Sequence, residues 1–220
     1  MLSAREGYAL WAPRYEIETA ISFLEDRLVT ALQVPLSNRR LLDAGCGTGR
    51  RIADVGSALA VGIDLTPDML TRPATAASLA AADIRALPFG ANTFDVVWCR
   101  LVIGHVRELD VAYAELARVC RPGGTLVVTD FHPDAVAAGH RRSFRDLSGK
   151  VQQIEHYVHR VGAHERVAGA LGLSLWSRRD AEVGTLVRPF YERARRLAAY
   201  ERQRGLRIVL ALAFRRGFES

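Results

Sequence analysis

The sequence predicts an α/β domain built on a doubly wound, largely parallel sheet. Three observations predict this fold class: apolar segments typical of buried strands alternate with helix-like segments, the first such strand runs directly into a glycine-rich turn, and 49% of the 220 residues are hydrophobic. Alternation at this spacing implies right-handed crossovers between parallel strands. The length suits one domain with room for a modest insertion.

Residues 1–37 are expected to form a helical cap that precedes the sheet. Residues 16–33 place apolar side chains three and four positions apart, which predicts an amphipathic helix. Before that helix, Tyr8, Trp11 and Tyr15 offer aromatic rings that could stack on a flat ligand or shield a cation. For Trp11, packing onto the sheet is an equally good interpretation.

The glycine-rich turn is the strongest local signal of a ligand site. Residues 41–50 read Leu-Leu-Asp-Ala-Gly-Cys-Gly-Thr-Gly-Arg, which predicts a strand over 41–43, a tight turn and a helix over 50–55. Glycines permit positive φ and let a ligand approach the backbone, and the amides of a helix start attract negative charge. The turn therefore predicts a nucleotide-like ligand.

The next elements place the expected site at one edge of the sheet. Further strands are expected over residues 58–64, 78–83, 94–99 and 125–130, with helices starting at Thr66-Pro67 and over 109–119. The Arg-Pro-Gly-Gly at 121–124 is expected to end the second of these helices. Ligands of such sheets bind beyond the carboxyl ends of the strands, which here means residues 45–49, Asp64, Asp83, 99–105 and 130–132.

The rest of the chain is expected to complete the sheet around an insertion. Residues 133–164 form a long polar stretch, which we interpret as an inserted lid or hairpin because a bare loop of that length is uncommon. A helix over 165–171, a strand over 173–183, an arginine-rich helix over 189–202 and a last strand over 206–214 are expected to follow. Residues 165–220 thus form the C-terminal half of the sheet.

Five short motifs in order carry a family resemblance. They are Asp-Ala-Gly-Cys-Gly-Thr-Gly at 43–49, Gly-Ile-Asp at 62–64, Asp83 with Leu-Pro-Phe at 87–89, Phe-Asp-Val-Val at 94–97, and Arg-Pro-Gly-Gly at 121–124. Together they resemble the class I S-adenosylmethionine-dependent methyltransferases, in particular the small-molecule and ubiquinone-biosynthesis-like subgroup. A dehydrogenase would show the glycine pattern G-x-G-x-x-G instead. The resemblance implies a Rossmann-like, seven-stranded sheet with residues 38–132 as its cofactor-binding half and an antiparallel last strand between the fifth and sixth strands.

The resemblance also implies S-adenosyl-L-methionine as cofactor and S-adenosyl-L-homocysteine as product. Asp64 is expected to accept hydrogen bonds from the ribose hydroxyls, Asp83 to accept one from the adenine amino group, and Asp43 to brace the loop near the methionine ammonium. The expected cofactor-binding residues are Asp43, Gly45, Cys46, Gly47, Gly49, Asp64, Leu65, Met69, Asp83, Ile84, Cys99 and Arg100. The thiols of Cys46 and Cys99 are interpreted as packing groups, because an activated cysteine needs a base or cation beside it.

Methyl transfer from a sulfonium depends mainly on alignment of acceptor, methyl group and sulfur. A base is needed only if the acceptor must lose a proton; His105 is the first candidate and His132 the second, each weighed against a structural histidine. A small organic acceptor is expected, because residues 98–101 lack the Asn/Asp-Pro-Pro-Tyr/Phe motif of amino-methylating DNA, RNA and protein enzymes. The expected acceptor-binding residues are Tyr8, Trp11, Tyr15, His140, Phe144, His156 and Tyr157.

Composition leaves two alternative functions open. The net charge is +6, and every basic residue except Lys150 is arginine; a late arginine cluster leaves an RNA methyltransferase as one alternative, although compositional bias is the preferred explanation and nucleic acid is not the expected partner. A cofactor-binding protein that works by interaction is the other alternative. No metal is expected, since Asp130, His132, His156 and His159 lack ligand spacing. Because neither a signal peptide nor an apolar membrane span is recognised, a cytoplasmic location is expected. The expected oligomeric state is a monomer or a homodimer.

Overall fold

The computed structural model is organised around a seven-stranded mixed sheet with the order β3-β2-β1-β4-β5-β9-β8. The structure describes residues 1–53, 55–71 and 77–218. The strands are β1 Arg40–Ala44, β2 Leu59–Asp64, β3 Ser78–Ala81, β4 Phe94–Arg100, β5 Cys120–Phe131, β8 Leu173–Glu182 and β9 Arg207–Arg216. Strands β1 to β5 pair in parallel, whereas β9 is antiparallel to both β5 and β8. The predicted fold class and the position of the antiparallel last strand are confirmed.

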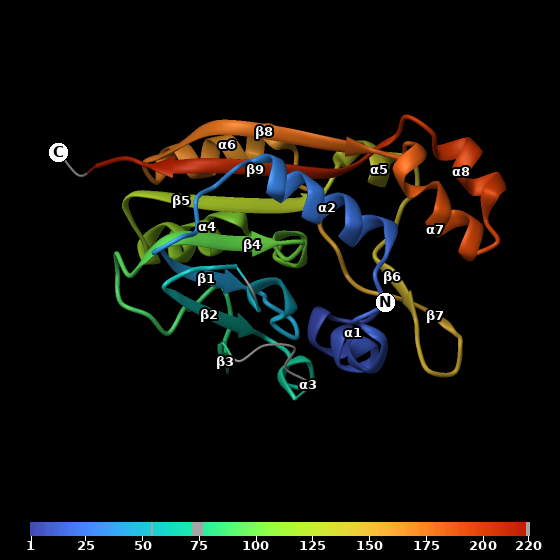
Figure 1. Ribbon diagram of the computed structural model, residues 1–220, viewed down its shortest axis with the longest axis horizontal. Coiled ribbons are helices and arrows are strands. Elements are labelled where there is room, and N and C mark those ends of the chain that lie inside the picture. The colour runs from blue at the N-terminus through green and yellow to red at the C-terminus, as the bar shows by residue number, and fades with distance from the viewer. Residues whose placement is uncertain (54, 72–76, 219–220) are drawn as a thin grey trace.

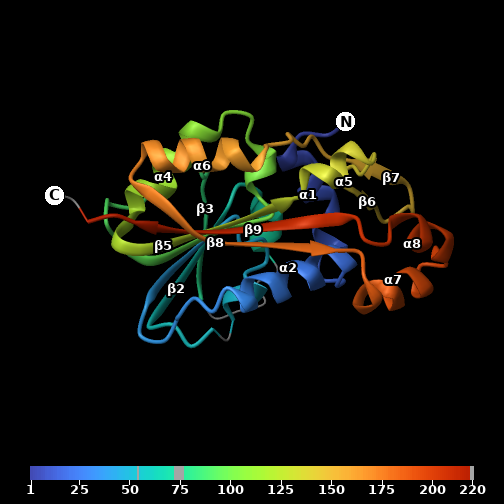
Figure 2. The same cartoon turned by 90° about the horizontal axis from the view of Figure 1, so that it is seen from above.

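Helices cover both faces of this sheet (Figure 2). One face carries α4 Leu109–Val119 and α6 Val161–Ala170, and the other carries α2 Ala20–Ala31, while α7 Arg188–Arg193 and α8 Leu197–Gln203 lie beyond the ends of β8 and β9. The shorter helical elements are α1 Ala4–Trp11, α3 Pro67–Leu70 and α5 Pro133–Ala137, with 3₁₀ turns η1 Ala12–Arg14, η2 Arg50–Ile52, η3 Ile103–His105 and η4 Thr185–Val187. Because both faces are covered, the central strands read as continuous apolar runs.

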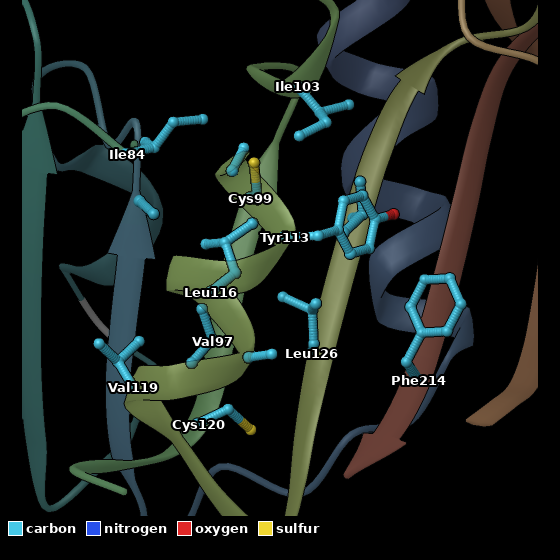
Figure 3. Close-up of a cluster of buried hydrophobic side chains, with 14 of the residues drawn as sticks. Ile84, Val97, Cys99, Ile103, Tyr113, Leu116, Val119, Cys120, Leu126 and Phe214 are labelled. Atoms are coloured by element: carbon cyan, nitrogen blue, oxygen red, sulfur yellow. The ribbon is translucent and has the colours of Figure 1, made fainter. Parts of the chain in front are cut away.

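Each face of the sheet buries its own apolar cluster. On one side, Tyr113 and Leu116 of α4 pack toward Leu126 of β5 (Figure 3). All seven residues of β4 are buried, and successive side chains point to opposite faces, so Val97 joins this cluster while Val96 joins the cluster under α2. The sheet is thus held rigidly between two helical layers, and its carboxyl edge is a fixed platform.

The insertion after β5 forms a helix and a hairpin beside the N-terminal cap. α5 is followed by a two-stranded sheet of β6 Ser143–Arg145 and β7 Val151–Gln153. Figure 1 shows this hairpin next to α1, beyond the end toward which β1, β2 and β4 run, and Leu2 pairs with Ile154 in an isolated bridge. α6 begins at Val161, so the last residues of the expected insertion belong to a helix. There His164 hydrogen-bonds to the Tyr113 hydroxyl at 2.9 Å.

Three expected helices differ in extent from the observed ones. The helix expected over 189–202 breaks into α7 and α8 at Arg195, whose φ is +54°. In one continuous helix Tyr191 and Tyr200 would face opposite sides; the break lets their ring centroids meet at 5.6 Å and buries Tyr200. The helix expected over 50–55 is the turn η2, with Asp54 outside the described residues, and the one expected over 16–33 is limited to α2 by the N-cap Thr19.

Candidate active site

The turn after β1 requires glycine at two positions, where a Cβ would meet different neighbours. Gly45 has a φ of +91°, and a Cβ there would lie 2.1 Å from Cγ2 of Val102. Gly47 has a φ of +59°, and a Cβ there would lie 3.0 Å from the ring of Tyr15 and 3.1 Å from Cε of Met69. The cap and the loop after β4 therefore close directly onto the glycine backbone, and any larger residue would separate them.

Asp64, the last residue of β2, ties this turn to the next helix. Its Oδ2 accepts from the Gly47 amide at 2.9 Å, and its Oδ1 accepts from the Thr66 amide at 2.8 Å. Burial raises the pKa of the Asp64 carboxyl, although these backbone N–H groups act in the opposite direction. The Thr66 side chain also interacts with this carboxylate, and the lone pairs that remain on its oxygens can accept hydrogen bonds from a ligand.

A cavity of about 380 Å³ opens beside Gly45 and Asp64 at the carboxyl edge of the sheet. It is enclosed by α1, the loops after β2, β3 and β4, and the segment after the hairpin. The predicted site residues that line it are Tyr8, Tyr15, Gly45, Asp64, Leu65, Met69, Asp83, Ile84, Arg100, His105 and Tyr157. Residues from distant parts of the chain therefore meet in one chamber of small-molecule size.

Asp43 lies buried behind the glycine turn with neither carboxylate oxygen hydrogen-bonded within the described part of the chain. Burial raises the pKa of Asp43 to about 6, against the attraction of Arg51 and Arg100. A buried carboxylate without a hydrogen bond is unfavourable. Asp43 does not line the cavity, and its expected role near the methionine ammonium stays a prediction.

Arg100 borders the cavity, but its guanidinium is committed to the opposite side. Its Nε and Nη2 donate to the two oxygens of Glu25 at 2.8 Å each, and Nη2 also contacts Asp26. Arg51 lies 3.3 Å from the same Glu25. Burial acts to raise the pKa of Glu25, but the two guanidinium groups hold it at about 2. The Arg100 side chain therefore supports the floor of the site, and its expected role in cofactor binding stays a prediction.

Asp83 also has a partner that the sequence did not suggest. Arg85 donates through Nε to Oδ1 and Oδ2 at 3.0 Å each, and through Nη2 to Oδ2 at 2.6 Å. This arginine lowers the pKa of Asp83. Both residues line the cavity with Ile84, so Asp83 is available for a ligand only through the lone pairs that Arg85 leaves. Its role toward adenine stays a prediction.

The cap and the loop after β4 meet in a hydrogen-bonded chain of three side chains. Nδ1 of His105 lies 2.9 Å from the Glu155 carbonyl, which can only accept, so Nδ1 carries the proton and Nε2 accepts from the Tyr8 hydroxyl at 3.0 Å. Arg142 donates to the Tyr8 oxygen through Nη2 at 2.6 Å and Nε at 3.2 Å. Burial raises the pKa of Tyr8 to about 12, and burial and Arg142 lower the pKa of His105 to about 3.

Several predicted site residues lie outside the cavity lining. His132 caps α5, its Nδ1 accepting from the Asp134 amide at 3.1 Å, so the structure does not bring this candidate base to the site. Trp11 stacks on Phe144 with centroids 5.1 Å apart and an interplanar angle of 8°, which joins cap to hairpin. His156 hydrogen-bonds to Asp130 at 3.0 Å. The others outside the lining are Asp43, Cys46, Gly47, Gly49, Cys99 and His140.

The cysteines have the packing role that the sequence suggested. Cys99 points into the apolar cluster of Figure 3, and Cys46 lies where a Cβ on Gly62 would meet its sulfur at 2.7 Å. Burial raises the pKa of both thiols. Across the described ranges, no group of His, Cys, Asp and Glu is arranged to hold a metal ion.

Arg142 and Glu155 complete the Tyr8–His105 contact, and neither was predicted from the sequence. Both lie in the insertion, and nothing in the sequence distinguishes Arg142 from Arg141 or Arg145. What distinguishes Arg142 is its contact with Tyr8, which lies 134 positions earlier in the chain. Only the folding of the hairpin against the cap creates it.

Comparison with known proteins identifies the class. Residues 42–128 match the model of a family described as a methyltransferase domain. The chain is 30% identical over 167 residues to malonyl-[acyl-carrier protein] O-methyltransferase of Dechloromonas aromatica, covering 73% of this chain and 59% of the relative. It is 34% identical over 134 residues to demethylmenaquinone methyltransferase of Renibacterium salmoninarum, covering 56% of this chain and 56% of that relative.

The chain thus spans little more than half the length of these two curated relatives. Both relatives are named for methyl transfer, one to a malonyl group on a carrier protein and the other to a quinone. Neither name mentions RNA, so the RNA alternative gains no support from them.

Solved structures agree on the fold. An S-adenosylmethionine-dependent methyltransferase from Mesorhizobium loti superposes with a TM-score of 0.68 at 21% identity, covering 88% of this chain and 98% of that one. The [4+2]-cyclase SpnF superposes with a TM-score of 0.69 at 21% identity over 100% of this chain and 98% of its own. At this identity the likeness shows the fold alone.

The sheet order and the glycine turn agree with the match to the methyltransferase domain family. The chain carries that domain over residues 42–128, and the resemblance seen in its sequence is confirmed. Within the described ranges, none of the helices is long and apolar enough to cross a membrane.

Proposed function

We propose that this chain transfers the methyl group of S-adenosyl-L-methionine to a small organic acceptor, leaving S-adenosyl-L-homocysteine. The observation that carries the proposal is the position of Asp64, whose carboxylate fixes the Gly47 amide and lines the cavity at the same time. An acid at the end of the second strand suits the hydroxyls of a ribose. The names of the relatives support the same reaction.

Each part of the cofactor has a candidate partner among these residues. Asp64 would hold the ribose hydroxyls, Ile84 and Asp83 would border the adenine, and Asp43 would face the ammonium. Tyr15 covers Gly47 and would exclude water from the sulfonium side. When bound, S-adenosylmethionine supplies a methyl group that is already activated, so the residues of the chain mainly bind and orient the acceptor.

The acceptor would occupy the part of the cavity between the cap and the loop after β4. Tyr8, His105 and Tyr157 line this part. Because Trp11 and Phe144 stack on each other outside the lining, they would shape the cap without touching the acceptor. A cytoplasmic location and a monomeric or homodimeric state complete the proposal.

The experiment is an assay of S-adenosylhomocysteine formation by the purified protein with a panel of carboxylic acids, phenols, amines and bulk RNA. We expect turnover with a small-molecule class, loss of that turnover in Asp64→Ala and near wild-type turnover in Asp68→Ala, an exposed acid of α3. Methylation of RNA alone would overturn the proposal in favour of the RNA alternative. Cofactor binding without turnover of any compound would favour an interaction protein.

A further inference from the structure

The connection between β8 and β9, residues 183–206, carries most of the excess positive charge of the chain. It holds six arginines and two glutamates, a net charge of +4, whereas the other 196 residues hold 24 basic and 22 acidic residues. A general preference for arginine over lysine accounts for the residue type throughout the chain, but not for an excess confined to one connection. The excess is therefore a local property of residues 183–206, which we call the basic segment.

The fold places the basic segment at the edge of the sheet that carries the cavity. Strand β9 is antiparallel to both β5 and β8, so β8 runs parallel to β5 and ends at the same edge as β1 to β5. The basic segment leaves β8 at that end, and Figures 1 and 2 show α7 and α8 beyond the ends of β8 and β9. A partner that binds the segment therefore lies at the same edge of the sheet as the cavity.

The arginines of the basic segment are exposed and only partly neutralised. The exposed arginines are Arg188, Arg193, Arg195, Arg196, Arg202 and Arg204. The two glutamates pair with Arg188 at 2.9 Å and with Arg204 at 3.6 Å. Among the residues that the structure describes, no carboxylate forms an ion pair with Arg195, Arg196 or Arg202. The charges of these three arginines are therefore available to an external anion.

The aromatic rings of the basic segment are engaged inside the protein. Phe190 packs on Phe23 of α2 with ring centroids 5.4 Å apart. The ring centroids of Tyr191 and Tyr200 lie 5.6 Å apart, and the Tyr191 hydroxyl donates to Gln203 at 2.7 Å. This packing fixes α7 and α8 on the sheet, so the arginines are held on a preformed surface. It also leaves none of the rings of residues 183–206 free to stack on the bases of single-stranded RNA.

The exposed apolar side chains of the basic segment are aliphatic. Leu186 is 55% exposed and Leu197 is 41% exposed, and Leu197 directly follows Arg196 in the chain. Anionic lipid headgroups attract exposed arginines, and aliphatic side chains gain free energy by entering the boundary between headgroups and acyl chains. Guanidinium groups beside aliphatic side chains therefore match a lipid surface better than they match single-stranded RNA.

We infer that the basic segment binds the surface of a bilayer that contains anionic phospholipids. Arg195, Arg196 and Arg202 would contact the lipid phosphates, and Leu186 and Leu197 would enter the interface. This contact would hold the cavity edge of the sheet next to the bilayer. The inference goes beyond the proposed function and does not depend on it, because lipid binding needs neither cofactor nor acceptor.

The test is co-sedimentation of the full chain with vesicles of phosphatidylcholine alone and of an equimolar mixture with phosphatidylglycerol. Binding is expected to the mixed vesicles only and should weaken as salt is added. The double variant Arg195→Gln/Arg202→Gln should bind the mixed vesicles at least about tenfold more weakly. The matched control, Arg40→Gln/Arg166→Gln, removes two exposed arginines of β1 and α6 and should bind like wild type. Absence of binding to mixed vesicles, or equal weakening in the two double variants, would overturn the inference.

Two further measurements separate a lipid surface from other anions. Leu186→Gln keeps every charge and should weaken binding to the mixed vesicles at least about threefold; unchanged binding would contradict the inference. At the same ionic strength and phosphate concentration, polyuridylate should bind wild type more weakly than the mixed vesicles, and tighter binding would indicate a nucleic-acid surface instead. If a double variant does not fold by circular dichroism, Arg202→Gln and Arg166→Gln replace the two double variants, with the same expected contrast.

Discussion

The Tyr8 hydroxyl donates to Nε2 of His105 at 3.0 Å across 97 positions of the chain. Tyr8 belongs to the cap and His105 to the turn after β4, so this contact makes the N-terminal helix a wall of the cavity. Because the Glu155 carbonyl fixes the His105 tautomer, the segment after the hairpin also takes part. The site is therefore complete only when cap, sheet and insertion are assembled.

The first prediction concerns stability in acid. The pKa of His105 is lowered to about 3 in the folded protein, so below pH 6.5 the unfolded chain binds a proton that the folded one excludes. The contribution of neutral His105 to the free energy of unfolding is therefore fully present above about pH 6.5, the pKa of His105 in the unfolded chain. It is lost as pH falls from about 6.5 toward 3. In His105→Gln, urea unfolding at pH 7.5 and 5.0 should show a smaller loss than in wild type. Equal losses would contradict the assignment.

The second prediction separates crowding from backbone strain at the glycine turn. Gly45→Ala should abolish S-adenosylhomocysteine binding and lower the melting temperature, because its φ is +91° and its Cβ would overlap Val102. Gly56→Ala is the matched control, since Gly56 also has a positive φ, of +64°, but nothing within 4 Å of a Cβ. It should lose only about 1 kcal/mol of stability and keep its affinity. Equal behaviour of the two variants would show that crowding at Gly45 is unimportant.

The third prediction concerns Asp43, whose pKa is raised to about 6. A raised carboxyl pKa means that the folded state favours the neutral form of Asp43. The contribution of neutral Asp43 to stability is therefore present at a pH below the pKa that Asp43 has in the unfolded chain, and it is lost as pH rises through about 6. Asp43→Asn should therefore stabilise the ligand-free protein at pH 8 by about 2 to 3 kcal/mol and weaken S-adenosylhomocysteine. Thermal unfolding and calorimetry, with Asp68→Asn as control, measure both. Unchanged affinity would remove Asp43 from the ammonium site.

The fourth prediction concerns the buried pair of Glu25 and Arg100. Arg100→Met should destabilise the protein by about 3 to 5 kcal/mol, because it leaves Glu25 buried with less compensation. The pKa of Glu25 is held at about 2 in the folded protein. The contribution of ionised Glu25 to stability is therefore present above about pH 4.5 and is lost as pH falls toward 2. The exposed pair Arg188–Glu192 is the control, and Arg188→Met should change stability by under about 1 kcal/mol. Similar effects in denaturant unfolding would contradict the structural role of Arg100.

Features set by neighbouring residues could be predicted from the sequence. Gly45, Gly47 and Asp64 belong to strand–turn–helix units, where spacing alone fixes which atoms face the ligand edge. The antiparallel position of β9 came from the family resemblance, and the structure confirms it. These parts depend on short stretches of chain or on a pattern shared by the family.

Contacts between distant segments could not be predicted. Arg100 ends β4, where a site residue is expected, but its length lets it reach Glu25, 75 positions away. His132 also follows a strand, yet it turns to cap α5. Arg142 shows no distinguishing pattern and gains its environment only when the hairpin meets Tyr8. The acceptor side of the site is therefore a property of the fold.

Calorimetric titration of S-adenosylhomocysteine into the wild-type protein and Asp64→Ala decides whether Asp64 holds the cofactor in this cavity. We expect saturable one-to-one binding to wild type, weakened at least about tenfold in Asp64→Ala and unchanged in Asp68→Ala. Absence of binding to the wild type, or equal binding to Asp64→Ala, would show that Asp64 does not have this role.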